Sequence, residues 1–113
     1  MARLVSTGDG LQVQLTAWEC VGALHRPFAV PWEHVVAIAE VDDVWARLRG
    51  IRAPGTGWPG RIMLGTTRYS GGRDFCAVYR HRPGFVVQLR EEGFARLLIT
   101  AEEGATAPVI PVG

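Results

Sequence analysis

Residues 61–100 alternate strand-forming segments with turn sequences, and this pattern restricts the chain to a β-rich fold. Side chains alternate along residues 62–67 with the two-residue period of a strand. Gly71-Gly72 suits a type I′ hairpin, because both central residues of that turn need positive φ. The sequences "RPG" at 82–84 and "EEG" at 91–93 predict two further turns. The segment therefore predicts an antiparallel meander.

The first half of the chain predicts three more strands, at residues 11–15, 28–30 and 35–41. With the meander this makes seven short antiparallel strands, which is typical of a barrel or a sandwich. No repeat or linker divides the sequence, so a single domain over residues 1–113 is expected. Residues 101–113 predict an irregular or short-helical tail, because Gly and Pro interrupt them.

Two short helical turns are expected between the early strands. Thr16 stands three residues before Glu19, which is the spacing of a capping box, and a helix should follow in which Ala17, Val21 and Leu24 share a face. The second turn covers residues 44–48. Asp42 and Asp43 precede it as N-cap candidates, and Gly50 stands where it should end.

Composition limits the chain to one globular core. It has 113 residues, of which 48% are hydrophobic and 20% charged, so some apolar surface should remain exposed and favour self-association. No apolar run approaches the ~20 residues that span a bilayer, and the start "MARLVSTGDG" lacks the apolar segment of a secretory signal. Two cysteines, Cys20 and Cys76, fit a reducing cytoplasm.

The stretch "RAPGTGWPG" at 52–60 contains the spacing G-x-G-x-x-G. In a dinucleotide fold these glycines follow a strand and open a helix. Here a helical segment precedes them and a strand follows, so the stretch does not predict a nucleotide site. We interpret it as a rigid connection. Trp58 at its centre either plugs the core or stands exposed as a contact residue.

The motifs "VPW", "DD" before a tryptophan, "RAPGTG-PG", "LGT" and "GG-DF" occur in that order. In this respect residues 10–100 resemble small actinobacterial proteins with a bacterial PH-like domain. The resemblance implies a seven-stranded, strongly bent antiparallel barrel, closed at one end by a C-terminal helix that looks short or interrupted here. The family has no established common activity. Phosphoinositide binding is not transferred, because the chain has no lysine and its first 46 residues are net acidic.

Arginine supplies all twelve basic residues, and eight of them lie between Arg47 and Arg82 with Asp74 as the only acid. A basic face forms if the fold gathers them. The alternative is a solvated rim, because the hairpins at 71–72 and 82–84 should lie at opposite ends of the fold. The candidate partner-binding residues are Trp58, Arg52, Arg61, Arg68, Arg73, Arg80 and Arg82.

No catalytic, metal or cofactor site is predicted. Cys20 and His25, like Cys76 and His81, are five residues apart, a step that turns donors away from each other on a strand or a helix. No nucleophile elbow G-x-S-x-G occurs. Nucleic acid is not predicted as a partner, because few aromatic residues are interleaved with the arginines.

These observations favour a non-catalytic PH-like interaction module in the cytoplasm, which mediates protein contacts or forms a homo-oligomer. The alternative is a peripheral module at the inner membrane face, where arginine-rich turns bind anionic headgroups. An uncharacterised enzyme or small-ligand carrier is the third hypothesis, and a pocket with convergent polar groups would favour it.

Overall fold

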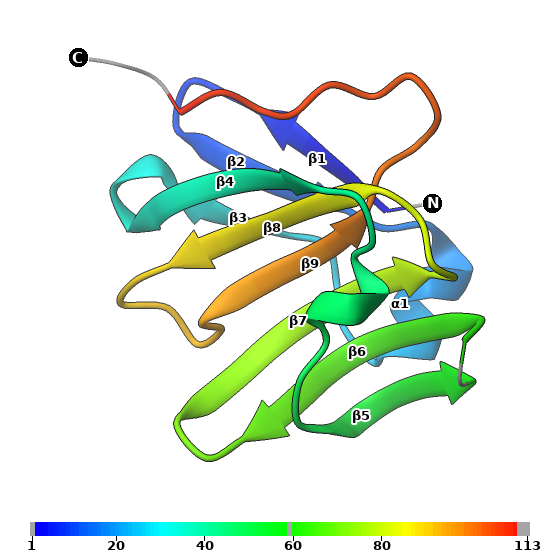
Figure 1. Ribbon diagram of the computed structural model, residues 1–113. Helices are drawn as coiled ribbons and strands as arrows, with labels where there is room; N and C mark the ends of the chain where they lie inside the picture. The colour runs from blue at the N-terminus through cyan, green and yellow to red at the C-terminus, as the bar shows by residue number, and fades with distance from the viewer. Residues whose placement is uncertain (1, 59, 111–113) are drawn as a thin grey trace.

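The computed structural model describes residues 2–58 and 60–110 and is mainly β (Figure 1). Its strands are β1 (Arg3–Ser6), β2 (Gly10–Gln14), β3 (Phe28–Pro31), β4 (Val35–Val41), β5 (Ile51–Trp58), β6 (Ile62–Tyr69), β7 (Gly72–Tyr79), β8 (Gly84–Leu89) and β9 (Arg96–Thr100). The helical segments are α1 (Ala17–Ala23) and two 3-10 turns, η1 (Trp32–His34) and η2 (Trp45–Arg47).

The first three strands form an antiparallel sheet in the order β1-β2-β3. Helix α1 connects β2 to β3 and begins with the predicted capping box, in which Thr16 and Glu19 exchange hydrogen bonds. It ends at Leu24, whose φ of 53° is left-handed. The three residues expected to share a face, Ala17, Val21 and Leu24, are all exposed, and the helix buries Glu19 and Ala23.

The other six strands form a second sheet in the order β4-β8-β9-β7-β6-β5. Strand β9 lies between β7 and β8, parallel to β7 and antiparallel to β8 (Figure 1). The predicted meander is therefore wrong beyond β7. The turn at 82–84 connects β7 to β8, but these two strands do not pair with each other, because β9 lies between them. The physical reason is burial. Residues 97–100 are at most 1% exposed, and so apolar a strand is most stable in the interior of the sheet.

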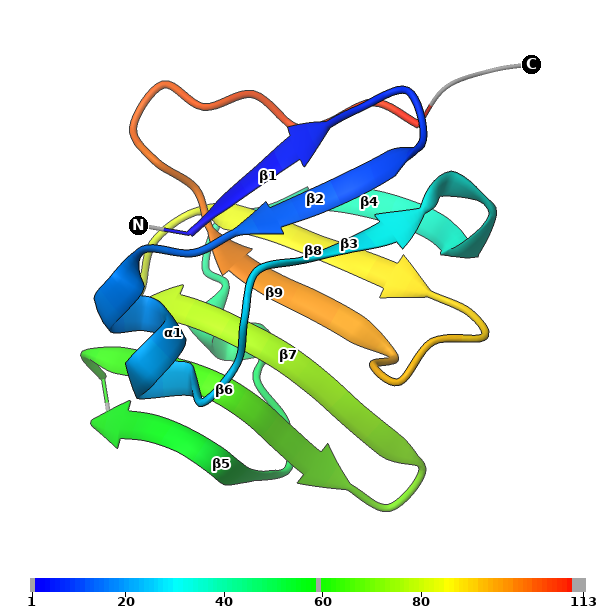
Figure 2. The same ribbon diagram turned by 180° about the vertical axis from the view of Figure 1, so that it is seen from behind.

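Both faces of the larger sheet are covered. One face packs on the smaller sheet around Phe75, Leu97 and Ile99 (Figure 2). The opposite face forms a second core below η2, in which Val44 contacts a set of buried side chains: Cys76, Val78, Val86 and Leu98. This double covering explains why β7, β8 and β9 are apolar on both faces.

The described residues do not form the predicted seven-stranded barrel. They form nine strands in two sheets, and neither sheet closes on itself. One additional strand is β1. The other is β5, which the sequence interpretation treated as a rigid connection. It pairs with β6, and the register shifts between Arg52 and Gly55, a bulge that accommodates a proline on an edge strand. At Gly55 an added Cβ would lie 2.0 Å from the Leu64 carbonyl oxygen, so the glycine permits the close pairing.

The second predicted helix is reduced to the 3-10 turn η2, whose N-cap position is Val44 rather than an aspartate. The tail contains no helix over residues 101–110. After β9 it runs past β1, and Ile110 packs against the core between the sheets (Figures 1 and 2). Residues 111–113, the end of the predicted tail, lie outside the described part of the chain.

Candidate functional site

Trp58 stands at the end of edge strand β5 and is 63% exposed. It pairs across the sheet with Ile62, which pairs in turn with Tyr79 on β7. Cross-strand partners project from the same face, so the three side chains form a row. Trp18 of α1 extends the row, because its ring meets the Tyr79 ring edge-on with centroids 6.2 Å apart. Two tryptophans therefore lie at the two ends of one continuous row.

Helix α1 lies against β5 and β6, on the same face of the sheet. The hydroxyl of Thr56 donates to the Gly22 carbonyl at 2.7 Å, and Gly22 has no side chain to separate the helix from Leu64. The side of the helix that faces away from the sheet is uncovered. It carries three large apolar side chains whose exposed fractions are 53% for Trp18, 75% for Val21 and 68% for Leu24. We call Trp18, Val21, Leu24 and Trp58 the α1–Trp58 surface.

Three arginines surround the α1–Trp58 surface. The guanidinium of Arg61 lies 5.3 Å from the Trp58 ring centroid, a cation–π arrangement. The backbone nitrogen of Arg80 donates to the Arg61 carbonyl at 2.9 Å, which places the two residues side by side. Arg26 lines an open hollow together with Val21 and Leu24. All three arginines are exposed.

Glu19 is the only acidic residue among 16–27, 55–58, 60–62 and 79–80, and it is fully buried. Its carboxylate accepts from the Tyr79 hydroxyl and from the Ala2 backbone nitrogen, the latter at 2.8 Å. Burial by itself raises the pKa of Glu19, but the hydrogen bonds from Thr16 and Tyr79 outweigh it and lower the pKa below its ordinary value. The carboxylate fixes α1 to β7 and adds no acidic group to the surface.

The other candidate arginines lie elsewhere. Arg68 and Arg73 pair with each other at the opposite end of β6 and β7. Arg82 follows β7, and its carbonyl accepts from the Val44 backbone nitrogen. Arg52 belongs to β5, but its side chain is outside the described residues. The two turns lie at opposite ends, as predicted, so the candidate arginines do not form one patch.

A buried charge cluster lies near the Arg68 end. Asp74 is fully buried and accepts from Arg49 Nε at 3.0 Å, Arg96 Nη2 at 2.8 Å and the Tyr69 hydroxyl at 2.9 Å. Arg49 also lies 4.1 Å from the Tyr69 ring centroid. The hydrogen bond from Arg49 to Asp74 raises the pKa of that guanidinium. The carboxylate is saturated by protein donors, so we assign this cluster to stability.

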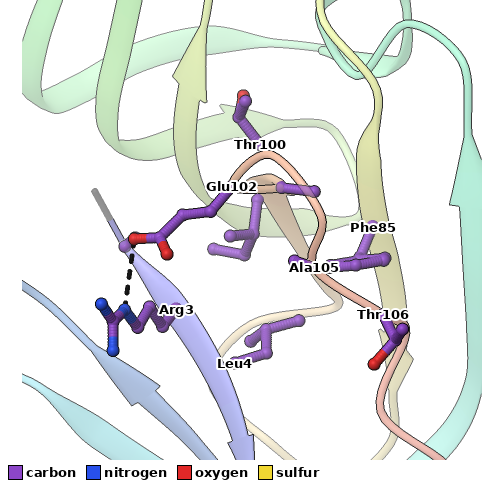
Figure 3. A pocket seen from close by; sticks show the side chains of 10 residues that line it. Arg3, Leu4, Phe85, Thr100, Glu102, Ala105 and Thr106 are labelled. Carbon is purple, nitrogen blue, oxygen red and sulfur yellow. Dashed lines mark hydrogen bonds and ion pairs between the residues drawn. The ribbon is translucent and has the colours of Figure 1, made fainter.

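A cavity of about 260 Å³ lies below the start of the tail (Figure 3). Leu4 and Phe85 line it, and Ala105 of the tail covers one side. At its opposite side the Nε of Arg3 on β1 donates to Glu102 Oε1 at 3.2 Å, with side-chain exposures of 62% and 36%. No local pattern predicts this cavity, because β1, β8 and the tail come from distant parts of the chain.

Within residues 2–58 and 60–110, no cluster of three or more His, Cys, Asp or Glu side chains is arranged to bind a metal ion. Burial raises the pKa of the Cys76 thiol to about 12, so this cysteine is not a poised nucleophile. His34 pairs with Glu92, and His81 with Asp43 at 2.8 Å. None of the helices in this part of the chain has the length and apolar character needed to cross a bilayer.

Comparisons with protein-family models, with curated proteins and with solved structures found no match to this chain.

Proposed function

We propose that the chain is a non-catalytic module that binds an anionic membrane surface peripherally through the α1–Trp58 surface. The observation that carries the proposal is the combination of four exposed apolar side chains, two of them tryptophan, with three exposed arginines. The segments that carry these residues, 16–27, 55–58, 60–62 and 79–80, contain no exposed acid. Single exposed apolar residues are ordinary, whereas a group of them on adjoining elements is typical of a contact surface.

The apolar residues suit the boundary between lipid headgroups and acyl chains. Tryptophan is enriched at that depth, because its ring is apolar and its N–H is polar. The exposed parts of Trp18, Val21, Leu24 and Trp58 each contribute roughly 1 kcal/mol on leaving water. Each arginine near an anionic leaflet adds about 1 kcal/mol. The loss of free motion on binding offsets part of this gain, so weak, reversible and salt-sensitive binding is expected.

Charge argues against a symmetric dimer through the same surface. A two-fold interface brings each patch against its own copy, which would set Arg26, Arg61 and Arg80 near the same residues of the partner. Like charges in that arrangement oppose association. A protein partner of any kind would also need a groove shaped to four protruding side chains, whereas a fluid bilayer deforms around them.

The PH-like assignment stays a prediction alongside this function. A mainly β single domain is compatible with it, while the unclosed sheets and the extended tail depart from the expected barrel and capping helix. The proposed surface also differs from the sequence hypothesis in its residues. It uses Arg61 and Arg80 but not Arg68 or Arg73, and the apolar face of α1 is added.

Vesicle co-sedimentation tests the proposal. We expect binding to phosphatidylserine–phosphatidylcholine vesicles, weaker binding as salt increases, and little binding to phosphatidylcholine alone. Trp58→Ala and Arg61→Gln should each weaken binding several-fold without lowering the melting temperature, because both side chains are exposed. Arg47→Gln is the matched control, since Arg47 is an exposed arginine on η2, away from this surface.

Two outcomes would reject the proposal. One is equal binding by the wild type, Trp58→Ala and Arg61→Gln. The other is a dimer in light scattering that Trp58→Ala dissociates, with no vesicle binding by the wild type. The second result would instead support the self-association predicted from the sequence.

A further inference from the structure

We propose that the cavity below the tail binds a small apolar α-amino acid, with the zwitterionic head at the Arg3–Glu102 pair and the side chain between Leu4 and Phe85. This site is separate from the α1–Trp58 surface, and the inference does not depend on the membrane proposal.

The cavity exists because the tail is extended. A helix after β9 would cover this end of the fold, but residues 105–110 contain no regular structure, and Ala105 and Thr106 pass over the gap between β1 and the end of β9. Around the gap lie side chains that are almost fully buried, with Phe85 at 5% and Ile99 at 1% exposure. An apolar group that entered would therefore contact Leu4, Phe85 and Ile99, while Arg3 and Glu102 provide polar groups at the edge of the same cavity.

Its size limits the ligand. Pockets for drug-sized molecules measure about 300–1,000 Å³, and this cavity is smaller, at about 260 Å³. The volume suits an aliphatic chain of a few carbons or one phenyl ring. It does not suit a nucleotide or a long acyl chain.

The charged side chains at the edge of the cavity determine which charged groups the ligand should carry. Arg3 uses only Nε toward Glu102, so both terminal nitrogens of its guanidinium have no protein acceptor among the described residues. A carboxylate fits that fork with two parallel hydrogen bonds. Glu102 lies beside it and provides an acceptor for an ammonium group. A donor and an acceptor of opposite charge, 3.2 Å apart, match the carboxylate and ammonium groups of an α-amino acid.

The pair is also easily rearranged. Both side chains are partly exposed, and an exposed ion pair contributes little to stability, so opening it for a ligand has a small cost. Figure 3 shows the pair on the β1 side of the cavity and Phe85 with Ala105 on the other. The head group would thus remain near solvent while the side chain points inward.

Isothermal titration calorimetry with L-leucine and L-phenylalanine tests the inference. We expect both to bind, and we expect two analogues of phenylalanine to bind about tenfold more weakly, because each loses one charged hydrogen-bonding group. These analogues are N-acetyl-L-phenylalanine, without the ammonium, and 2-phenylethylamine, without the carboxylate. Ala105→Leu should abolish binding by filling the cavity, and the fold should tolerate it because Ala105 is exposed.

Two charge variants assign the head group. Glu102→Gln should weaken L-phenylalanine about tenfold and leave N-acetyl-L-phenylalanine unchanged, and Arg3→Gln should do the same with 2-phenylethylamine as the unchanged ligand. Glu103→Gln, an exposed neighbour that does not line the cavity, is the control. The inference is overturned if neither amino acid binds, if both analogues bind as tightly as L-phenylalanine, or if Arg3→Gln and Glu102→Gln leave its affinity unchanged.

Discussion

Replacing Asp74 by asparagine should strongly lower the free energy of unfolding, because it removes a buried negative charge that is paired with two arginines. The carboxylate is fully buried and accepts hydrogen bonds from two arginines and a tyrosine. Asparagine removes the negative charge and turns one acceptor into an amide that faces arginine donors. The guanidinium of Arg96, with a side-chain exposure of 16%, then has no counter-charge in a largely dry setting.

Breaking a buried ion pair by removing one partner costs about 3–5 kcal/mol. The Arg49 contribution is smaller, because its side chain is 44% exposed and solvent compensates for the lost charge. We therefore expect a loss of about 3 kcal/mol in the free energy of unfolding, which lowers the melting temperature by roughly 10 °C for a domain of this size. Urea unfolding and calorimetry measure both quantities.

Asp42→Asn provides the control for Asp74→Asn, since Asp42 is exposed and belongs to no ion pair in the described structure. Its unfolding free energy should stay within about 0.5 kcal/mol of the wild type. A change of less than about 1 kcal/mol for Asp74→Asn would refute the reasoning, because it would mean that the two arginines do not need the carboxylate.

Three further predictions concern a turn, a titration and a thiol. Gly71→Val should lower stability by about 1–2 kcal/mol, because φ at this residue is 140° and a β-branched side chain resists positive φ; an unchanged melting temperature would contradict the assignment. Glu19 has a pKa lowered from 4.5 in the folded state, so its stabilisation is complete above pH 4.5 and is lost as the pH falls through the folded-state pKa. Glu19→Gln should therefore flatten the acid limb of a stability–pH curve, and parallel curves would argue against it. Iodoacetamide at pH 8 should label the partly exposed Cys20 and spare Cys76, whose pKa is raised to about 12, and mass spectrometry of native protein would reveal any labelling of Cys76.

Local signals in the sequence predicted the elements that local interactions determine. The Thr16–Glu19 capping box begins α1 as expected, and a hairpin joins β6 to β7 at the predicted place. The predicted type I′ turn at Gly71-Gly72 is wrong, because Gly72 already pairs with Tyr69 and the turn residues are Ser70 and Gly71, of which only Gly71 has positive φ. The strands at 28–31 and 35–41 also follow from their apolar runs and flanking prolines or aspartates. In each case the residues that define the element lie within a few positions of one another.

Pairing over long distances was not predictable in the same way. The insertion of β9 between β7 and β8 depends on which strand gains most from burial on both faces. Hydrophobic periodicity describes each strand separately, so it does not predict which strands are neighbours in the sheet. Strand β5 was missed because glycine and proline normally indicate a connection. Here they form a bulged edge strand that a larger residue at Gly55 would clash with.

The candidate surface was predicted in part. Trp58 was singled out as a residue that is either buried or exposed, and the structure exposes it. The exposed face of α1 was missed. The available signal was Glu19, because a capping-box glutamate that also meets Tyr79 turns the helix so that Val21 and Leu24 face outward. That contact spans two distant segments, so only the tertiary structure reveals it.

The interior position of β9 has a consequence for the order in which the protein acquires its structure. Strands β5, β6 and β7 form one ladder and β4 with β8 another, and β9 hydrogen-bonds to both. A nascent chain that has not yet released residues 96–100 from the ribosome therefore carries two separate ribbons with unpaired edges. Completion of the larger sheet must wait until residues 96–100 have been synthesised, and the unpaired edges are most prone to aggregate before β9 inserts.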